Sequence, residues 1–304
     1  METKLNKKQF EIIGALLIVY ILWGGTYLGM KIGIETIPPF LLAGARFLLA
    51  GTILYVYAKI KGAKNPTIED WKTSAIIGAL LLLGGNGVVC WAEQTVPSGI
   101  AALLIATVPL WIMLLGFFGF MSEKVKHSFG SMFGVLLGLV GIAILVLPNS
   151  ISGGSSQAID IVGLVAIILA SLSWSFGSMY SRKASHHESA LMSNGLQMIS
   201  GGVMLLIMAF ILGDFNDFNI QAVSSRSIIA FLYLVIFGSI IAYTAFVWLL
   251  KNAEPLWVST YAFVNPIVAV FLGYLLAGEV LGLNSMISAV VIISSVVIIT
   301  LFKR

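Results

Sequence analysis

Ten apolar stretches of about twenty residues each run through the chain, separated by charged, proline-containing or polar segments. An α-helix of this length crosses the roughly 30 Å hydrocarbon core of a bilayer. Strands of a membrane β-barrel would be about ten residues of alternating polarity, whereas residues 161–170 are apolar on every face. The sequence therefore predicts an all-α integral membrane protein. Its ten transmembrane helices are expected near residues 11–32, 37–58, 73–94, 98–121, 128–148, 159–180, 189–212, 227–250, 256–277 and 283–302.

The composition excludes most other classes of protein. Apolar residues make up 59% of the 304 residues and charged residues only 10%, where about 25% charged is usual. A soluble domain would lack the polar surface to cover itself, and disorder needs far fewer apolar residues. The net charge of +4 comes from bases clustered between the apolar stretches, which argues against nucleic-acid binding. With one cysteine, Cys90, and three histidines that lack a carboxylate cluster, we expect no intramolecular disulfide, metal or other cofactor.

The basic residues indicate which ends of the helices face the cytoplasm. Fourteen Lys and Arg residues fall in one set of alternating loops and termini, and two, Lys31 and Arg226, fall in the opposite set. Because Lys and Arg accumulate on the cytoplasmic side, both termini are predicted to be cytoplasmic in a multi-pass inner-membrane protein. The first apolar stretch is too long for a signal peptide and is expected to remain as a membrane anchor.

Residue pairs at a nearly constant separation suggest an internal repeat. The pairs are Trp23 with Trp174, Lys31 with Arg182, Gly44 with Gly195, Arg46 with Gln197, Trp91 with Trp248, Pro97 with Pro255, Pro109 with Pro266, and Glu123 with Glu279. They predict two repeats, residues 1–150 and 151–304, of five helices each. Residues 149–157 suit an external linker between the repeats, and an ordinary flexible loop is equally compatible with them. Because five is odd, the second repeat enters the membrane from the opposite side, as in many secondary transporters.

Several of these segments resemble a known family. They are residues 97–111, Asn265-Pro266, Gly278-Glu279, Trp23-Gly-Gly-Thr and Ala45-Arg46-Phe47. The chain resembles the EamA family of the drug/metabolite transporter superfamily over nearly its whole length, most of all its YedA-like members. The resemblance implies a bacterial inner-membrane exporter of small metabolites, amino acids or amphipathic drugs, with a central cavity between the repeats. It names no substrate.

A charged residue in mid-span is the first candidate for a transport site. Arg46 lies about halfway along its helix, where an Arg costs about 2.5–3.5 kcal/mol unless it faces protein or water. Its planar donors suit an anionic group such as a substrate carboxylate. The alternative is that Arg46 binds backbone carbonyls freed by a nearby kink. Its counterpart Gln197 can extend the same network without supplying charge.

Weak points in the helices are the next candidates. Residues 84–87, Gly-Gly-Asn-Gly, favour local unwinding that would expose backbone carbonyls and the Asn86 amide to a cavity; the alternative is close helix packing. Asn265 precedes Pro266, and Pro109 occupies the matching place in the first repeat. A helix-interior proline leaves a carbonyl without its donor, so the paired prolines predict kinks at the centre of the transport path.

Aromatic and acidic residues complete the predicted site. The aromatic residues expected to line a cavity, rather than simply to pack helices, are Trp23, Tyr27, Trp174, Tyr243 and Tyr261. Such a wall would suit aromatic, amphipathic or cationic solutes. Glu93, near the outer end of the third span, is the acidic residue best placed for proton coupling, although a Glu at a span boundary is more often solvated.

Two further patterns have mainly structural interpretations. Gly130, Gly134 and Gly138 form a small-residue stripe that is expected to seat the fifth helix against the tenth; a homodimer interface is the competing use. The run His186-His187-Glu188 resembles a ligand cluster, but it is expected to be a solvated cytoplasmic loop.

The sequence thus favours a secondary transporter that exports a small organic solute by alternating access. Its expected partners are that solute, membrane lipid and protons, and it is expected to be a monomer or homodimer that binds no nucleic acid. An uncoupled facilitator fits the same residues. A membrane enzyme is disfavoured because the sequence has no Gly-x-Ser-x-Gly, no His-Glu-x-x-His and no acid cluster within the spans. A channel would be expected to show pore loops or rings of charge.

Overall fold

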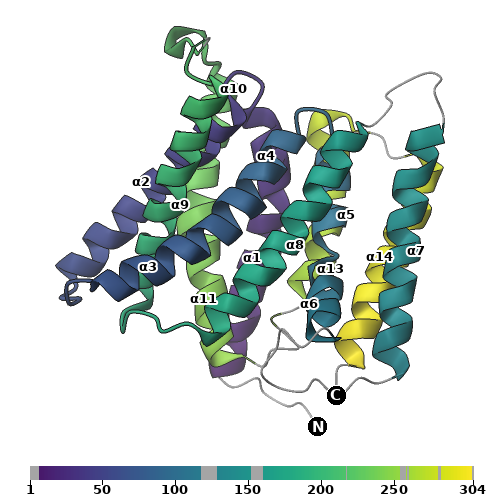
Figure 1. Ribbon diagram of the computed structural model, residues 1–304, viewed down its shortest axis with the longest axis horizontal. Coiled ribbons are helices and arrows are strands. Elements are labelled where there is room, and N and C mark those ends of the chain that lie inside the picture. Colours follow the sequence, from purple (N-terminus) through teal and green to yellow (C-terminus); the bar gives the residue numbers. More distant parts are fainter. Residues whose placement is uncertain are drawn as a thin grey trace.

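The computed structural model describes residues 7–117, 129–151, 160–216, 218–253, 258, 260–279 and 282–302. These residues form helices joined by turns and short loops, without a strand among them (Figure 1). The first half comprises α1 (Lys7–Gly33), α2 (Pro39–Ile60), α3 (Ile68–Ile77), η1 (Gly78–Gly87), α4 (Val88–Ala92), α5 (Ser98–Ile105), α6 (Val108–Phe117) and α7 (Phe129–Ile151). The second comprises α8 (Ile161–Lys183), α9 (Ala190–Leu212), η2 (Ile220–Ala222), α10 (Ser225–Tyr233), η3 (Leu234–Ile241), α11 (Ala242–Asn252), α13 (Tyr261–Ala277) and α14 (Leu283–Leu301).

Seven helical segments of the described chain are long and apolar enough to cross a membrane. They are Lys7–Gly33, Pro39–Ile60, Ile68–Ala92, Ser98–Gly116, Ile161–Lys183, Ala190–Leu212 and Ser225–Leu249. Shorter apolar helices, Met132–Ile144, Val264–Ala277 and Leu283–Ile299, lie where the fifth, ninth and tenth spans are predicted. The all-helical membrane fold is therefore confirmed, while the count of ten spans stays a prediction.

Helices far apart in the sequence pack side by side at both edges of the bundle. At one edge α2 runs along α9 (Figure 1), and glycines bring the two backbones together. A Cβ added to Gly51 would lie 2.8 Å from the carbonyl oxygen of Gly195, and one added to Gly202 would lie 2.7 Å from the backbone nitrogen of Leu48. Small residues of this kind allow close packing of membrane helices without a side-chain layer between them.

At the opposite edge α7 runs along α14, and the glycine stripe lies in this contact. The Ser295 hydroxyl donates to the carbonyl of Gly134 over 2.8 Å, and the Ser288 hydroxyl donates to the carbonyl of Gly141 over 2.7 Å. The prediction that the stripe seats the fifth helix against the tenth is therefore confirmed.

Two π-helices interrupt the helices that pack nearest the centre. The segment η1 continues α3 into α4, and η3 continues α10 into α11. The expectation of unwinding at residues 84–87 is wrong, because the chain there widens into a π-helix instead. A π-helix keeps its backbone groups bonded over five residues rather than four, so the glycines relax the helix without breaking it.

The two predicted kinks differ from each other. Pro266 lies inside α13, which continues through it. Pro109 lies in the first turn of α6, directly after a turn at Ala106 and Thr107 that ends α5. Proline is well tolerated in a first turn, because the N–H it lacks would have no partner within the helix. The fourth span is therefore broken just before Pro109 rather than bent at it.

Candidate functional site

A cavity lies at the centre of the bundle, between helices from both halves of the chain. Its volume is about 80 Å³, which is enough for several water molecules. Eight of the nine predicted substrate-binding residues line it: Trp23, Tyr27, Arg46, Asn86, Trp174, Tyr243, Tyr261 and Asn265. These residues come from α1, α2, η1, α8, α11 and α13, so the fold gathers at one place side chains that are widely spaced in the sequence.

Arg46 is the charged residue of the cavity and is only 3% exposed. Its Nε donates to the Ser239 hydroxyl on η3 over 2.8 Å, and its guanidinium carbon lies 4.6 Å from the centre of the Phe47 ring. Its Nη1 is buried and has no hydrogen-bond partner among the described residues. Within the described residues this hydrogen bond of Arg46 goes to a hydroxyl and not to a backbone carbonyl, so it does not support the alternative of a kink-binding Arg.

Two amide side chains add acceptors on other sides of the cavity. Asn86 is carried by η1, and Asn265 is carried by α13 one residue before Pro266. The Oδ1 atoms of both are buried, and neither has a hydrogen-bond partner within the part of the chain that the structure describes. Because buried polar groups are usually satisfied, a cationic donor and two amide acceptors left open around one cavity are free to bind water or a ligand with complementary groups.

Aromatic rings form the apolar part of the wall. The Trp23 ring lies edge-on to Tyr261 with centroids 5.5 Å apart, and 6.4 Å from the Tyr243 ring. The indole Nε1 of Trp23 donates to the carbonyl of Gly238 over 3.0 Å. On the opposite half of the chain, the Trp174 ring approaches Gly85 so closely that an added Cβ would lie 2.9 Å from its Cε3. The rings are thus held in place and present flat apolar surface to the cavity.

Gln197, the ninth predicted residue, lies behind this wall. Its Oε1 accepts a hydrogen bond of 2.7 Å from the Tyr243 hydroxyl, and its Nε2 donates to the Ser193 hydroxyl over 3.3 Å. Ser193 in turn contacts Nδ1 of His186, in the loop before α9, at 3.3 Å. Gln197 therefore positions Tyr243, and a chain of polar contacts leads from the cavity wall to that loop. The described residues contain no group of three or more metal-ligating side chains.

Glu93 is placed differently from its expected solvated position. It follows α4 and is 0% exposed, and neither of its carboxylate oxygens has a hydrogen-bond partner in the described parts of the chain. The Lys31 ammonium donates to the backbone carbonyl of Glu93 and, over 3.5 Å, to that of Gln94. Glu93 is not among the residues that line the cavity. The expectation of a solvated Glu at this boundary is therefore wrong.

Among the further cavity residues that were not singled out individually from the sequence, Thr26, Phe47 and Ser239 bear on the site. Thr26 and Phe47 line the cavity within segments quoted for the family resemblance, and Ser239 holds Arg46. The signal that could have found Ser239 is a lone hydroxyl in the apolar run 234–242, where a polar group needs a partner.

The comparisons with known proteins agree with this architecture. The chain matches the EamA-like transporter family over residues 10–147 and again over residues 161–301. It is 39% identical over 300 residues to the inner membrane transporter YedA of Escherichia coli K12, covering 98% of this chain and 93% of YedA. It is 24% identical over 283 residues to the transporter YoaV of Bacillus subtilis, covering 93% and 94% of the two chains.

The fold is also similar to a solved crystal structure. The two superpose with a TM-score of 0.64 over 96% of this chain and 97% of the other, at 18% sequence identity. At that identity the likeness shows a shared fold and nothing about the solute. With the two family matches and the YedA relative, the resemblance seen in the sequence is confirmed: the chain belongs to the EamA-like transporter family.

Proposed function

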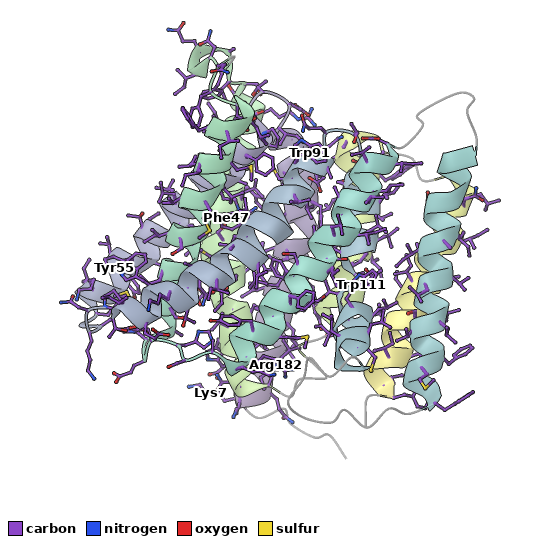
Figure 2. All side chains as sticks on the ribbon, in the orientation of Figure 1. Lys7, Phe47, Tyr55, Trp91, Trp111 and Arg182 are labelled. Atoms are coloured by element: carbon purple, nitrogen blue, oxygen red, sulfur yellow. The ribbon has the colours of Figure 1, made fainter. Side chains whose placement is uncertain are left out.

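We propose that the protein is a secondary transporter that exports a small amino-acid-like or amphipathic aromatic solute across the inner membrane by alternating access. In this proposal it consists of two inverted five-helix repeats, residues 1–150 and 151–304, with both termini in the cytoplasm. The transporter names of its relatives support the activity. Figure 2 supports the sidedness, because Lys7 and Arg182, both from the large basic set, lie at the lower end and Trp91 lies near the upper end.

Matching features of the two halves support the inverted repeat. Each half contributes one helix to the α2–α9 pair and one to the α7–α14 pair. The π-helices η1 and η3 begin at Gly78 and Leu234, a separation close to that of the repeated Pro and Glu pairs in the sequence. A carbonyl of η3, that of Gly238, accepts from a side chain of α1, and a carbonyl of η1, that of Leu80, accepts from the Ser173 hydroxyl of α8 over 2.8 Å.

The observation that carries the proposal is the set of open polar atoms around an aromatic cavity. Arg46 Nη1 suits a solute carboxylate, because a guanidinium is the preferred protein partner of that group. The Oδ1 atoms of Asn86 and Asn265 suit an ammonium group. The faces of Trp23 and Tyr261 suit an apolar or aromatic side chain, and they can also hold a cation. A zwitterionic amino acid with an apolar side chain satisfies all three.

Coupling to protons through Glu93 is the second part of the proposal. A buried carboxyl without partners is stable when it carries a proton, and it needs a cation or water when it releases that proton. Lys31 binds the backbone carbonyl of the same residue, so a cation is nearby. The alternative is an uncoupled facilitator, which is favoured by the position of Glu93 outside the cavity wall.

The test is a comparison of solutes inside and outside cells that produce the intact protein, the Arg46→Ala variant or the Arg226→Ala variant at equal membrane abundance. Arg226 is the matched control, because its guanidinium forms a solvent-exposed ion pair with Glu35 at 3.6 Å, away from the cavity. One chemical class should accumulate outside with the intact protein and with Arg226→Ala, but not with Arg46→Ala. Chemical conversion of a solute without relocation would favour an enzyme instead.

A further inference from the structure

The carboxylate of Glu279 joins the end of one cavity-lining helix to the start of another segment of the cavity wall. Glu279 follows α13, which ends at Gly278 in a left-handed conformation, and its backbone N–H donates to the carbonyl of Gly273 over 3.1 Å. This closing turn directs the side chain across to α5. Its Oε1 accepts from the backbone N–H of Ser98 over 2.9 Å. Its Oε2 accepts from the Ser98 hydroxyl over 2.9 Å and from the backbone N–H of Gly99 over 3.2 Å.

This contact supplies a cap that α5 lacks in its own sequence. The residue before α5 is Pro97, which has no side-chain acceptor to offer the free N–H groups of the first turn. A carboxylate is the favoured partner at that end of a helix, both for hydrogen bonding and for the helix dipole. Glu279 therefore caps α5 from a position 180 residues away in the chain.

Glycines on both helices make room for the carboxylate. A Cβ added to Gly273 would lie 2.6 Å from Oε2 of Glu279, and one added to Gly99 would lie 3.0 Å from a methyl carbon of Val270. At these two points the helix surfaces thus meet through glycines rather than through large side chains on both helices. A contact of this kind can separate and re-form without repacking a hydrophobic layer.

Other polar links between the two halves gather at the same end of the bundle, at the top in Figure 1. The Thr36 hydroxyl accepts from the backbone N–H of Ser224, and the Ser227 hydroxyl donates to the carbonyl of Ile32. Here the Ser98 side chain is 0% exposed. In this conformation helices from the two halves of the chain are thus joined at this end by partly buried hydrogen bonds.

We propose that the Glu279 carboxylate is a releasable latch that holds this end closed, and that its release from Ser98 and Gly99 accompanies opening of the cavity to that side. Both joined helices line the cavity: α13 contributes Tyr261 and Asn265, and α5 contributes Ile105 at its end. When the helices part, water can hydrate both the carboxylate and the N–H groups, so the latch opens at modest cost. The inference rests on the proposed alternating access, with this end facing outward.

The experiment measures access to the cavity and needs no solute. Cys90 is replaced by Ala, and Thr26→Cys places one thiol in the cavity wall. Reaction with a membrane-impermeant thiol reagent is timed in right-side-out and in inside-out vesicles. Glu279→Gln keeps the size of the side chain but exchanges one acceptor oxygen for a donor. The Glu279→Gln variant should raise the labelling rate from outside about fivefold or more and lower the rate from inside. The reason is that the population shifts from the state closed at this end to the state open at this end.

Two variants calibrate the effect. Ser98→Ala removes only the hydroxyl bond and should give a smaller shift in the same direction. Glu35→Gln breaks an exposed ion pair at the same end and should change either rate less than about twofold. Size-exclusion profiles of the purified variants check that each is folded.

The outcomes separate the latch from the proposed function. If Glu279→Gln leaves both rates unchanged, or raises both equally as general loosening would, there is no latch. If the shift occurs with the two sides exchanged, the latch stands and the proposed sidedness fails. Loss of export in the solute comparison alone, with the labelling shift intact, would count against the exporter and not against the latch.

Discussion

The indole N–H of Trp23 on α1 donates to the backbone carbonyl of Gly238 in η3, over 3.0 Å. The bond crosses from the first half of the chain to the second, and it ends on a backbone carbonyl of a π-helix. The Ser173 hydroxyl on α8 reaches the carbonyl of Leu80 in η1 in the same way. Each π-helix is therefore bonded to a helix of the other half, next to the cavity.

Trp23→Phe should weaken this connection while it keeps most of the ring packing. The carbonyl of Gly238 would lose the indole as a partner, which should lower the free energy of unfolding by about 1 kcal/mol. Transport should be reduced as well. The control is Trp71→Phe on the exposed side of α3, which should change neither. Thermal unfolding of the purified variants and transport in vesicles check this; equal behaviour of the two variants would show that the Trp23 bond contributes nothing.

Arg46→Ala should reduce transport about tenfold or more, because it removes the cationic donor of the cavity. It also leaves the Ser239 hydroxyl without its Arg46 partner. Arg46→Lys should be intermediate, since the charge remains but the planar set of donors does not. Initial rates at equal membrane abundance measure both. Equal rates for Ala and the intact protein would remove Arg46 from the solute site.

Glu93→Gln should abolish the dependence of exchange on a pH gradient while solute–solute exchange continues. The substitution keeps the shape of the buried side chain and removes its ability to bind and release a proton. Glu35→Gln, on a partly exposed acid at the same end of the bundle, is the matched control. A pH dependence that survives in Glu93→Gln would leave the facilitator as the better account.

Gly134→Ala should destabilise the protein by about 1–3 kcal/mol with little direct effect on solute affinity. The added Cβ would lie 2.8 Å from Cγ1 of Ile299 and 3.1 Å from its backbone nitrogen, so α7 and α14 must move apart. Gly14→Ala has nothing within 4 Å of the new Cβ and should be neutral or slightly stabilising. Thermal unfolding of the pair in one detergent measures the difference. A stabilised Gly134→Ala would show that the contact is looser than described.

The sequence predicts the all-helical membrane fold well, because the length and hydropathy of the apolar stretches reflect the thickness of the bilayer. It also predicts the residues of the cavity wall, since a polar or aromatic group deep in a span needs a protein environment. Depth in the membrane does not reveal which face of its helix a residue occupies, however. The sequence therefore does not show that Gln197 lies behind Tyr243 rather than in the cavity wall. The burial of Glu93 and the π-helices depend on tertiary packing. Whether residues 84–87, Gly-Gly-Asn-Gly, unwind or form a π-helix depends on the neighbouring helices, so the local sequence does not predict it.

The most direct test of the account is counterflow in liposomes that contain the purified protein. Vesicles preloaded with an unlabelled apolar or aromatic amino acid are diluted into a trace of the labelled compound, with Arg46→Ala vesicles as control. A carrier that alternates around one cavity predicts transient accumulation of label above the external concentration, saturation with solute, and loss of both with Arg46→Ala. Entry that neither saturates nor overshoots, for every solute class that the protein relocates in cells, would contradict alternating access at this cavity.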